Sequence, residues 1–387
     1  MNKVKEIIEN ASPQLNGVSY RRLSDVKAEP IQWLWDKRIA RGKLTILAGD
    51  PGLGKSQLTA YMAARVTNGT EWPVENAQCP HGSVVFLSAE DDAADTIRPR
   101  LEAVGANLSK IFILDAVKCV DVDGKQYERG FDLKQDIQNL DTFLTNIGDT
   151  ALVVIDPISA YLGGTDSHKN SDIRALLSPL SDMAAKHNVS VLGVTHLNKS
   201  QSKQALQRIT GSLAFVAAAR AAYVVAKDQD NPERRLFLPI KNNIGDDRTG
   251  FAFTIESVAL SGGIHTSHVV FEDDLITEQA DEILSSDNER QEQSALEEAK
   301  EFLREVCIIG RTANEVKTQA RQAGISEATL NRAKSALGIK PKKDGQKGSW
   351  IWRLPDLEDV QGAHPKNVST FDKVEHLQTK ENGTCQD

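Results

Sequence analysis

The strongest constraint on the fold is the phosphate-binding pattern G-x-x-x-x-G-K-S, which stands between a predicted strand and a predicted helix. Its residues are Gly49, Asp50, Pro51, Gly52, Leu53, Gly54, Lys55 and Ser56. An apolar run at 44–48 precedes the pattern, and a helix-compatible stretch from Gln57 to Val66 follows it. Glycines let such a loop wrap a phosphate with backbone N–H groups, and the helix N-terminus adds a favourable dipole. Residues 49–57 are therefore predicted to bind a nucleotide.

Two side chains of the loop and one aspartate further along have distinct expected roles. Lys55 can reach the β- and γ-phosphates of ATP, and Ser56 can ligate Mg²⁺ through its hydroxyl. Asp156 closes the apolar run 151–155, which has the form of a Walker B strand. We expect Asp156 to face Mg²⁺ beside Ser56, although many strands end in an aspartate that is only a turn or a cap. ATP and Mg²⁺ are the expected cofactors.

Composition narrows the class of protein only slightly. The chain has 387 residues, 40% of them hydrophobic and 26% charged, which is ordinary for a globular protein of one or two domains. Its net charge of −8 gives no general attraction to nucleic acid or anionic membranes, so any such binding must be local. The four cysteines lie far apart and predict neither a disulfide framework nor a zinc site. Without an apolar run long enough to span a bilayer, or the core of a signal peptide, a cytoplasmic location without membrane contact is expected.

Apolar runs alternate with helix-like segments, which predicts an α/β fold with a mostly parallel sheet. Expected strands are 83–88, 111–114, 151–155 and 190–195, and expected helices are 92–104, 133–147 and 172–187. Four later segments are expected to extend the sheet as antiparallel strands: 221–226, 235–240, 251–256 and 265–271. The expected organisation is an N-terminal segment (1–30), an ATPase domain (31–272), a linker or solvated helix (273–294), a second compact unit (295–355) and a disordered tail (356–387).

Glu90 follows the apolar run 83–89 and is the first of three consecutive acids. Acids before a predicted helix favour its dipole, which is the local explanation for Glu90, Asp91 and Asp92. A glutamate at the end of the strand that follows the phosphate-loop helix also resembles the RecA-like ATPases, whose catalytic base occupies that place. The resemblance implies that Glu90 is the base, and we expect Asp91 and Asp92 to cap the helix.

The segment 191–199 resembles the strand-and-sensor segment of hexameric RecA-fold helicases. In that pattern His196, at the carboxyl end of the strand, touches the γ-phosphate and reports its loss. Open α/β sheets place their ligands at this edge, which agrees with the implied role. A structural histidine with ordinary hydrogen bonds is the alternative.

Residues 210–220 and 239–245 are similar to the RepA-type replicative helicases of plasmids, a group of the AAA-type ATPases of phage and plasmid replication. The resemblance implies that Arg220 is an arginine finger that reaches the ATP of a neighbouring subunit. It also implies that Lys241 is a second basic residue near the same interface. Both residues are therefore expected to act on ATP in a ring, most simply a hexamer.

Arg220 stands within the otherwise apolar run 215–226. Burial of an arginine there is costly unless its charge meets an anion, and a phosphate would satisfy it as well as an ordinary carboxylate would. Ring helicases of the phage primase-helicase type have an arginine at the place of Asn243. This departure favours Arg220 over the Lys241 strand as the source of the finger.

Two polar loops are candidates for contact with single-stranded DNA. The first, 163–171, follows the strand of Asp156, and the second, 198–208, follows His196. The second carries Lys199, Lys203 and Arg208 and no acid, which suits contact with phosphates of any sequence. The alternative is a surface loop that contacts nothing.

The second unit has the sequence signature of a helix–turn–helix. A helix begins near Thr312 and ends at Gly324, and Ser326 can cap a following helix that runs to Leu337. With the following segment 339–352, which contains Trp350 and Trp352, it looks like a winged helix. Residues 293–355 hold 12 Lys and Arg against 7 Asp and Glu. We expect duplex DNA to bind through Asn331, Arg332, Lys334 and the wing lysines, or a protein partner instead.

These features together predict a ring-forming RecA-fold ATPase that moves along single-stranded DNA as a replicative helicase of a phage or plasmid. One alternative is a recombination or repair ATPase that forms filaments. Another is a DNA-binding regulator in which the winged helix reads an operator and the ATPase acts as a switch.

Overall fold

The computed structural model describes residues 20–165, 169–197, 213–344 and 348–355. The chain separates into two compact units, with the division after Asn288. In the part of the chain that is described, no helix is both long enough and apolar enough to cross a membrane. The expected tail 356–387 and most of the expected N-terminal segment lie outside the described residues.

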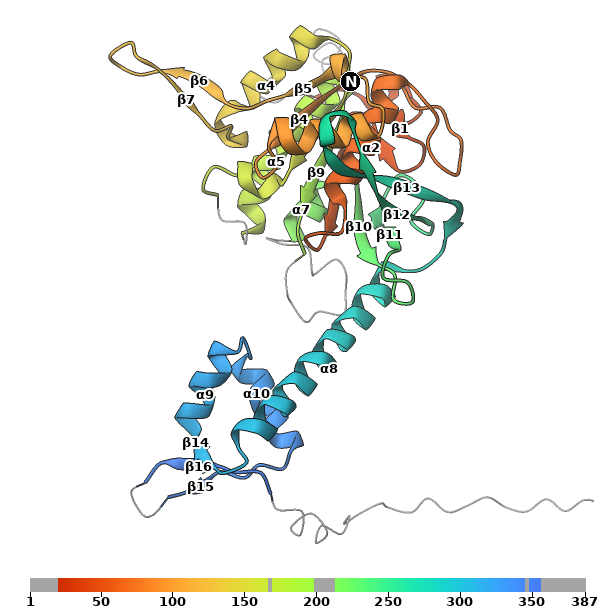
Figure 1. Ribbon diagram of the computed structural model, residues 1–387. Coiled ribbons are helices and arrows are strands. Elements are labelled where there is room, and N and C mark those ends of the chain that lie inside the picture. Colours follow the sequence, from red (N-terminus) through yellow and green to blue (C-terminus); the bar gives the residue numbers. More distant parts are fainter. Residues whose placement is uncertain (1–19, 166–168, 198–212, 345–347, 356–387) are drawn as a thin grey trace, which may run out of the picture. The chain divides into compact units, whose positions relative to one another are not determined.

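A nine-stranded sheet organises the described part of the first unit (Figure 1). Its strands, from one edge to the other, are β13 (His265–Ile276), β12 (Gly250–Ala259), β11 (Arg235–Asn242), β10 (Ala221–Lys227), β3 (Leu44–Gly49), β9 (Ser190–Thr195), β8 (Thr150–Asp156), β4 (Ser83–Ser88) and β5 (Ile111–Ile113). The six strands from β10 to β5 are parallel, and β11, β12 and β13 are added antiparallel. The expected α/β class is confirmed, with β11, β12 and β13 as the antiparallel strands. β10, which was expected among the antiparallel strands, is instead parallel to β3.

Helices cover both faces of this sheet because its central strands are apolar on both sides. In β3, Ile46 and Ala48 belong to the core on one face and Leu47 to the core on the other, and all three are buried. Near-continuous apolar strands of this kind are typical of a parallel sheet between two helical layers. One layer contains α4 (Leu133–Ile147), α5 (Asn170–His187) and α7 (Leu213–Ala218), and the other contains α2 (Lys55–Asn68) and α3 (Arg98–Ala103).

Several short elements join these layers and were not predicted. They are η1 (Leu23–Asp25), β1 (Trp33–Trp35), β2 (Ile39–Ala40), η3 (Leu108–Lys110), β6 (Val117–Val120), β7 (Gln126–Arg129), η4 (Ile158–Tyr161) and η5 (Ser261–Gly263). The expected helix 92–104 consists of η2 (Ala93–Ile97) followed by α3. The β6–β7 hairpin projects from the body of the unit in Figure 1. Arg129 anchors its base, since the guanidinium donates to both carboxylate oxygens of the buried Asp136 at 2.5 and 2.7 Å.

The second unit is a small α+β structure with its own core. Its elements are the carboxyl part of α8 (Ala280–Val306), α9 (Ala313–Gln322), α10 (Glu327–Ala336) and a sheet in the order β14 (Arg311–Thr312), β16 (Trp350–Trp352), β15 (Lys342–Lys343). Thr312 and Glu315 form a capping box at the start of α9, and Ser326 caps α10 as the sequence predicted. The stretch expected as a linker or solvated helix is helical from residue 280, while β13 continues to Ile276.

Candidate nucleotide-binding site

The phosphate-binding loop connects the last residue of β3, Gly49, to the first residue of α2, Lys55. Gly54 has a φ of 87°, a left-handed conformation that favours glycine, and a Cβ atom built on it would stand 2.4 Å from Cδ1 of Ile255. The Lys55 ammonium donates to the carbonyl oxygens of Gly49 and Asp50, both at 2.9 Å. Burial lowers the pKa of Lys55, while nearby carboxylates act to raise it. The Lys55 side chain therefore folds back onto the backbone of the loop that it follows.

Ser56 and Asp156, the two residues expected to bind Mg²⁺, lie next to each other beside the phosphate-binding loop. Ser56 Oγ donates to Asp156 Oδ2 at 2.9 Å, which joins the start of α2 to the carboxyl end of β8. Burial raises the pKa of Asp156, and the hydrogen bond from Ser56 and the charge of Lys55 oppose that rise. A hydroxyl and a carboxylate are oxygen donors of the kind that Mg²⁺ prefers. The donor set fits Mg²⁺, and Ser56 and Asp156 would hold it.

Glu90 and His196 lie at the same edge of the sheet. Glu90 stands two residues beyond β4, and its side chain is 60% exposed. His196 follows β9 directly, with Nε2 3.7 Å from Glu90 Oε1 and Nδ1 3.4 Å from Lys55 Nζ. All three side chains line one cleft together with Ser56 and Asp156. The structure therefore brings together every predicted residue of this edge.

The two acids that follow Glu90 differ in role, and one expectation is wrong. Asp92 is the predicted cap, because its Oδ1 accepts from the backbone N–H groups of Ala94 at 2.7 Å and Asp95 at 3.2 Å. Asp91 caps nothing: its carboxylate pairs with Arg100, with Nη1 to Oδ2 at 2.5 Å. The chain turns between the two residues. Asp91 therefore faces the cavity, and Asp92 faces the end of the helix.

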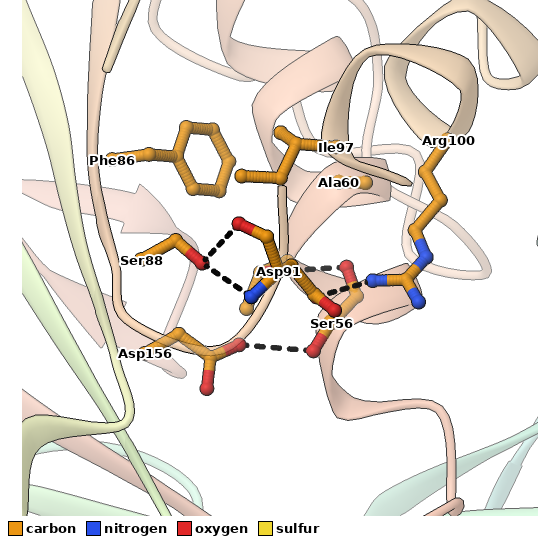
Figure 2. A pocket seen from close by; sticks show the side chains of 9 residues that line it. Ser56, Ala60, Phe86, Ser88, Asp91, Ile97, Arg100 and Asp156 are labelled. Atoms are coloured by element: carbon orange, nitrogen blue, oxygen red, sulfur yellow. Dashed lines mark hydrogen bonds and ion pairs between the residues drawn. The ribbon is translucent and has the colours of Figure 1, made fainter. Parts of the chain in front are cut away.

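Arg100 is a residue of the site that sequence reasoning missed. It lies on α3 and lines the cleft with Ser56, Asp91 and Asp156, as Figure 2 shows. An arginine in a predicted surface helix has many ordinary explanations, and helical periodicity alone does not say which face meets the loop. The nine-residue separation of Asp91 and Arg100 becomes informative only when the turn after β4 is known.

Arg220 lies at the opposite edge of the sheet from the phosphate-binding loop. β10 is parallel to β3, and Val225 pairs with Gly49, the strand end that opens the loop. Arg220 stands five residues before Val225, which is about 15 Å along a strand. Its side chain is exposed between α7 and β10, so the burial cost expected from the apolar run does not arise. In the described ranges, no ion pair involves Arg220.

Lys241 lies beside Arg220 at this opposite edge. It pairs across the sheet with Ala222, and its ammonium donates to the carbonyl oxygens of Val216 and Ala219, both at 2.8 Å. These carbonyls belong to the last turn of α7 and the residue after it. Burial lowers the pKa of Lys241, and the positive charges of Arg220 and Arg174 lower it further. Three cations therefore lie near one another at this edge.

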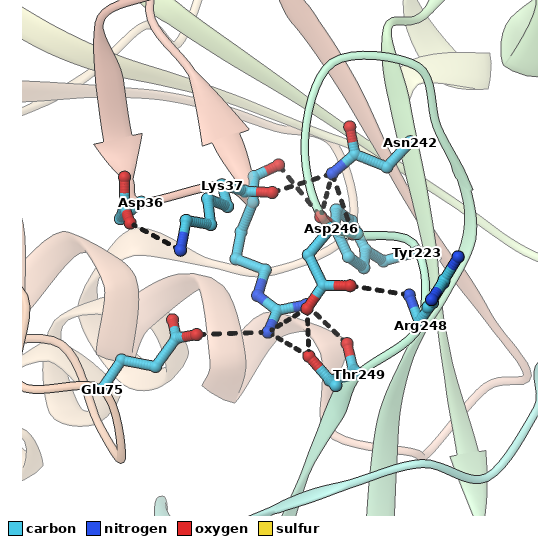
Figure 3. Close-up of polar contacts among 9 residues, drawn as sticks. Asp36, Lys37, Glu75, Tyr223, Asn242, Asp246, Arg248 and Thr249 are labelled. Carbon is cyan, nitrogen blue, oxygen red and sulfur yellow. Dashed lines mark hydrogen bonds and ion pairs between the residues drawn. The ribbon is translucent and has the colours of Figure 1, made fainter.

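A buried polar network fixes the loop that follows Lys241. Arg38 is fully buried, and its guanidinium donates to the carbonyl and hydroxyl oxygens of Thr249, both at 2.5 Å. The same group lies 3.2 Å from Asp246 and 3.4 Å from Glu75. Asn242 adds a hydrogen bond to the Asp246 carbonyl at 3.1 Å, and Figure 3 shows these groups converging on the loop. Sequence reasoning did not find this network, because Arg38 and Glu75 are far in the chain from the loop that they hold.

The candidate DNA loops are only partly described. Residues 198–208, with Lys199, Lys203 and Arg208, lie outside the described residues, as do 166–168 within the first loop. The described ends of that first loop, Gly163–Thr165 and Lys169, line a second cavity with Lys134. Contact of either loop with DNA stays a prediction.

Comparison with known proteins gives a match to one family model and matches to solved structures. Residues 10–202, just under half of the chain, match the family model of an AAA domain. Among the matching solved structures is the crystal structure of the RadB recombinase, with 19% identity and a TM-score of 0.40, over 56% of this chain and 89% of that chain. No curated protein matches the chain. The loop, the α/β sheet and the match to an AAA domain agree with a nucleotide-binding P-loop domain.

Proposed function

We propose that this protein is an ATP-driven DNA translocase that assembles into a closed ring, most simply a hexamer, and unwinds DNA in phage or plasmid replication. ATP lies between subunits in this arrangement. Residues 49–57 hold its phosphates, and Ser56 and Asp156 hold Mg²⁺. When bound, Mg²⁺ neutralises charge that develops on the phosphate oxygens.

The observation that carries the proposal is the separation of the two cationic sites. Arg220 lies about 15 Å from its own phosphate-binding loop along the sheet, and Lys241, which pairs with Ala222, lies about 10 Å from it with its ammonium held at the end of α7. Neither side chain therefore meets the ATP that this loop holds. Arg220 is exposed, as a residue that enters another subunit must be. A finger supplied by a neighbour makes hydrolysis conditional on assembly.

At the loop edge, Glu90 has the exposure that a base for a water molecule needs. His196 is placed between Glu90 and Lys55, both of which change their surroundings when the γ-phosphate leaves. The chain continues from His196 into the second candidate DNA loop. We propose that His196 passes the state of the nucleotide to that loop.

The decisive variant is Arg220→Ala, with Arg248→Ala as its matched control. Arg248 is an exposed arginine that follows the same sheet edge in the loop after β11. Arg220→Ala should lower kcat for ATP hydrolysis roughly 10³-fold or more, as the loss of an arginine finger does, with ATP affinity unchanged. Arg248→Ala should retain wild-type turnover. Normal hydrolysis by Arg220→Ala would remove the finger from the proposal.

A filament-forming recombination or repair ATPase is the second candidate, and the same edge geometry favours it equally. In a filament, too, Arg220 and Lys241 would meet the nucleotide of a neighbour. Electron microscopy with DNA and a slowly hydrolysed ATP analogue separates the two, since closed rings support the helicase and open filaments support the recombinase.

The second unit is proposed to be a winged helix that contacts duplex DNA. On α10, however, two of the three expected contact residues have partners within the unit: Arg332 is 3.0 Å from Glu292, and Lys334 lies over the Trp352 ring at 4.7 Å. Asn331 is exposed. Footprinting tests the regulator alternative, because a regulator protects a defined sequence and a translocase does not.

A further inference from the structure

A small cavity beside the phosphate-binding loop contains a carboxylate that has no assigned role. Its lining includes Ser56, Ser88, Asp91, Arg100 and Asp156. In Figure 2 the Asp91 carboxylate faces the cavity in which the Ser56–Asp156 hydrogen bond lies. Asp91 is thus on the metal side of the site, next to the two residues that would hold Mg²⁺.

The backbone explains why Asp91 reaches this position. Ser88, the last residue of β4, pairs with Asp156, the last residue of β8, and the N–H of Ala89 donates to the Asp156 carbonyl at 3.0 Å. The turn that carries Asp91 therefore begins level with Asp156. Ser88 Oγ lies 3.4 Å from both the backbone nitrogen and the carbonyl oxygen of Asp91. Strand register, rather than a flexible loop, sets the distance between the two acids.

The charges in the cavity are incompletely matched. Arg100 Nη1 binds Asp91 Oδ2 at 2.5 Å, whereas the Lys55 ammonium is bound to two loop carbonyls. Among the described side chains, Asp156 has a hydrogen bond from Ser56 and no cation within ion-pair distance. Two carboxylates in one cavity favour a bound cation between them.

We propose that Asp91 is a positioning residue for the metal: its carboxylate accepts hydrogen bonds from the water shell of the Mg²⁺ that Ser56 and Asp156 ligate, and Arg100 fixes the direction of that carboxylate. The inference rests on the proposed nucleotide and metal site. Mg²⁺ keeps several waters when it binds through one or two carboxylates. Partners in this outer shell typically change metal affinity 10–100-fold.

The test compares Asp91→Asn with Asp92→Asn in the full-length protein. Asn has the size of Asp but lacks its charge, and Asp92 is the neighbouring acid that caps a helix instead of facing the cavity. Mn²⁺ replaces Mg²⁺, and electron paramagnetic resonance measures free Mn²⁺ during titration of the protein with ADP. Asp91→Asn should weaken Mn²⁺ binding in the ternary complex at least about tenfold. Asp92→Asn should lower thermal stability and leave Mn²⁺ affinity at the wild-type value.

Binding of ADP in the presence of EDTA is the second readout, since it reports the loop without the metal. It should be equal in the wild type, Asp91→Asn and Asp92→Asn. Arg100→Lys, which keeps the charge but loses the planar guanidinium, should weaken Mn²⁺ binding less than Asp91→Asn does. Unchanged Mn²⁺ affinity in Asp91→Asn would overturn the proposal, and so would an equal loss of ADP affinity with and without metal.

Failure of the proposed function has a different signature. If wild-type protein binds ADP no better than Lys55→Ala does, the nucleotide site itself is wrong. If the wild type binds Mn²⁺ and ADP together and Asp91→Asn does so equally well, only the role of Asp91 is wrong.

Discussion

The two edges of the central sheet carry cations in different settings. At the carboxyl edge of the parallel strands, Lys55 is held by two loop carbonyls and Arg100 by Asp91. At the amino edge, Arg220 is exposed, and Lys241 donates only to carbonyls at the end of α7. One edge pairs its cations with acids and loop groups of the same site. The other presents cations for which the described residues supply no carboxylate.

In the proposed mechanism, the two edges carry two halves of one reaction: a half that binds ATP and a half that completes the catalytic site of a neighbouring subunit. A binding half needs its groups preorganised, which explains the contacts around Lys55 and Asp156. The half with Arg220 and Lys241, which would complete the catalytic site of a neighbouring subunit, must stay accessible until that subunit binds. The β10–β3 register separates the halves by about 15 Å, so a single chain cannot join them.

The largest expected effect concerns Glu90 at the carboxyl edge of the sheet. Glu90→Gln removes the proposed base while keeping the size of the side chain and its place beside His196. Turnover should fall roughly 10²–10⁴-fold, the usual contribution of general acid–base catalysis, with ATP affinity preserved. Steady-state hydrolysis and equilibrium nucleotide binding measure the two quantities. Turnover within a factor of two of wild type would show that the carboxyl edge has another base.

The next effect concerns the network below the amino edge. Arg38→Met leaves Asp246 and Glu75 without the guanidinium that lies between them, so the free energy of unfolding should fall by about 3–5 kcal/mol. Denaturant unfolding measures the loss. Lys37→Met, a change at the exposed neighbouring lysine, is the control and should cost little. A loss of less than 1 kcal/mol for Arg38→Met would contradict a structural role for this network.

A smaller effect is expected for Lys241. Lys241→Met keeps the apolar stem but removes two hydrogen bonds to the end of α7, together with a positive charge near Arg220. ATP turnover should fall about tenfold, less than for Arg220→Ala, and nucleotide affinity should stay unchanged. If Lys241→Met proves as inactive as Arg220→Ala, Lys241 belongs to the finger itself.

The smallest effect is a gain in stability from Asp156→Asn in the nucleotide-free protein. Burial raises the pKa of Asp156, so the folded state binds more protons than the unfolded state between the ordinary carboxyl pKa and the raised value. Stability therefore falls as pH rises through that window. Asp156→Asn removes this loss and should add about 1 kcal/mol at pH 7, while it abolishes the metal dependence of nucleotide binding. Thermal unfolding at pH 4 and pH 7 provides the check, and a destabilised variant would contradict it.

The sequence predicted the parts of the site whose position follows from strand ends. Residues 49–57, Glu90, Asp156 and His196 each stand where an apolar run stops, and parallel strands bring such ends to one edge. The antiparallel strands β11, β12 and β13 followed from turn residues between short extended segments, but the parallel pairing of β10 with β3 was not predicted. In the second unit, the start of a helix near Thr312 and the cap at Ser326 followed from local sequence spacing, whereas the capping box of Thr312 and Glu315 was not predicted.

Other features depend on packing between distant segments. Asp91 and Asp92 are equivalent in sequence, and only the turn after β4 sends one to a helix end and the other to Arg100. Arg220 was expected to meet an anion because apolar residues surround it in the chain. In the fold it stands at a junction between elements, where its neighbours are buried and its own side chain is exposed.

Mixing two inactive variants tests most directly whether ATP hydrolysis needs the phosphate-binding loop of one subunit and Arg220 of its neighbour. Lys55→Ala lacks the loop lysine but keeps Arg220, and Arg220→Ala keeps an intact loop, so each alone should hydrolyse almost no ATP. In an equal mixture of reassembled subunits, about a quarter of the interfaces join an intact loop to an intact arginine, and ATP hydrolysis should recover to roughly that fraction of wild type. A mixture as inactive as its two components would contradict catalysis shared between neighbouring subunits.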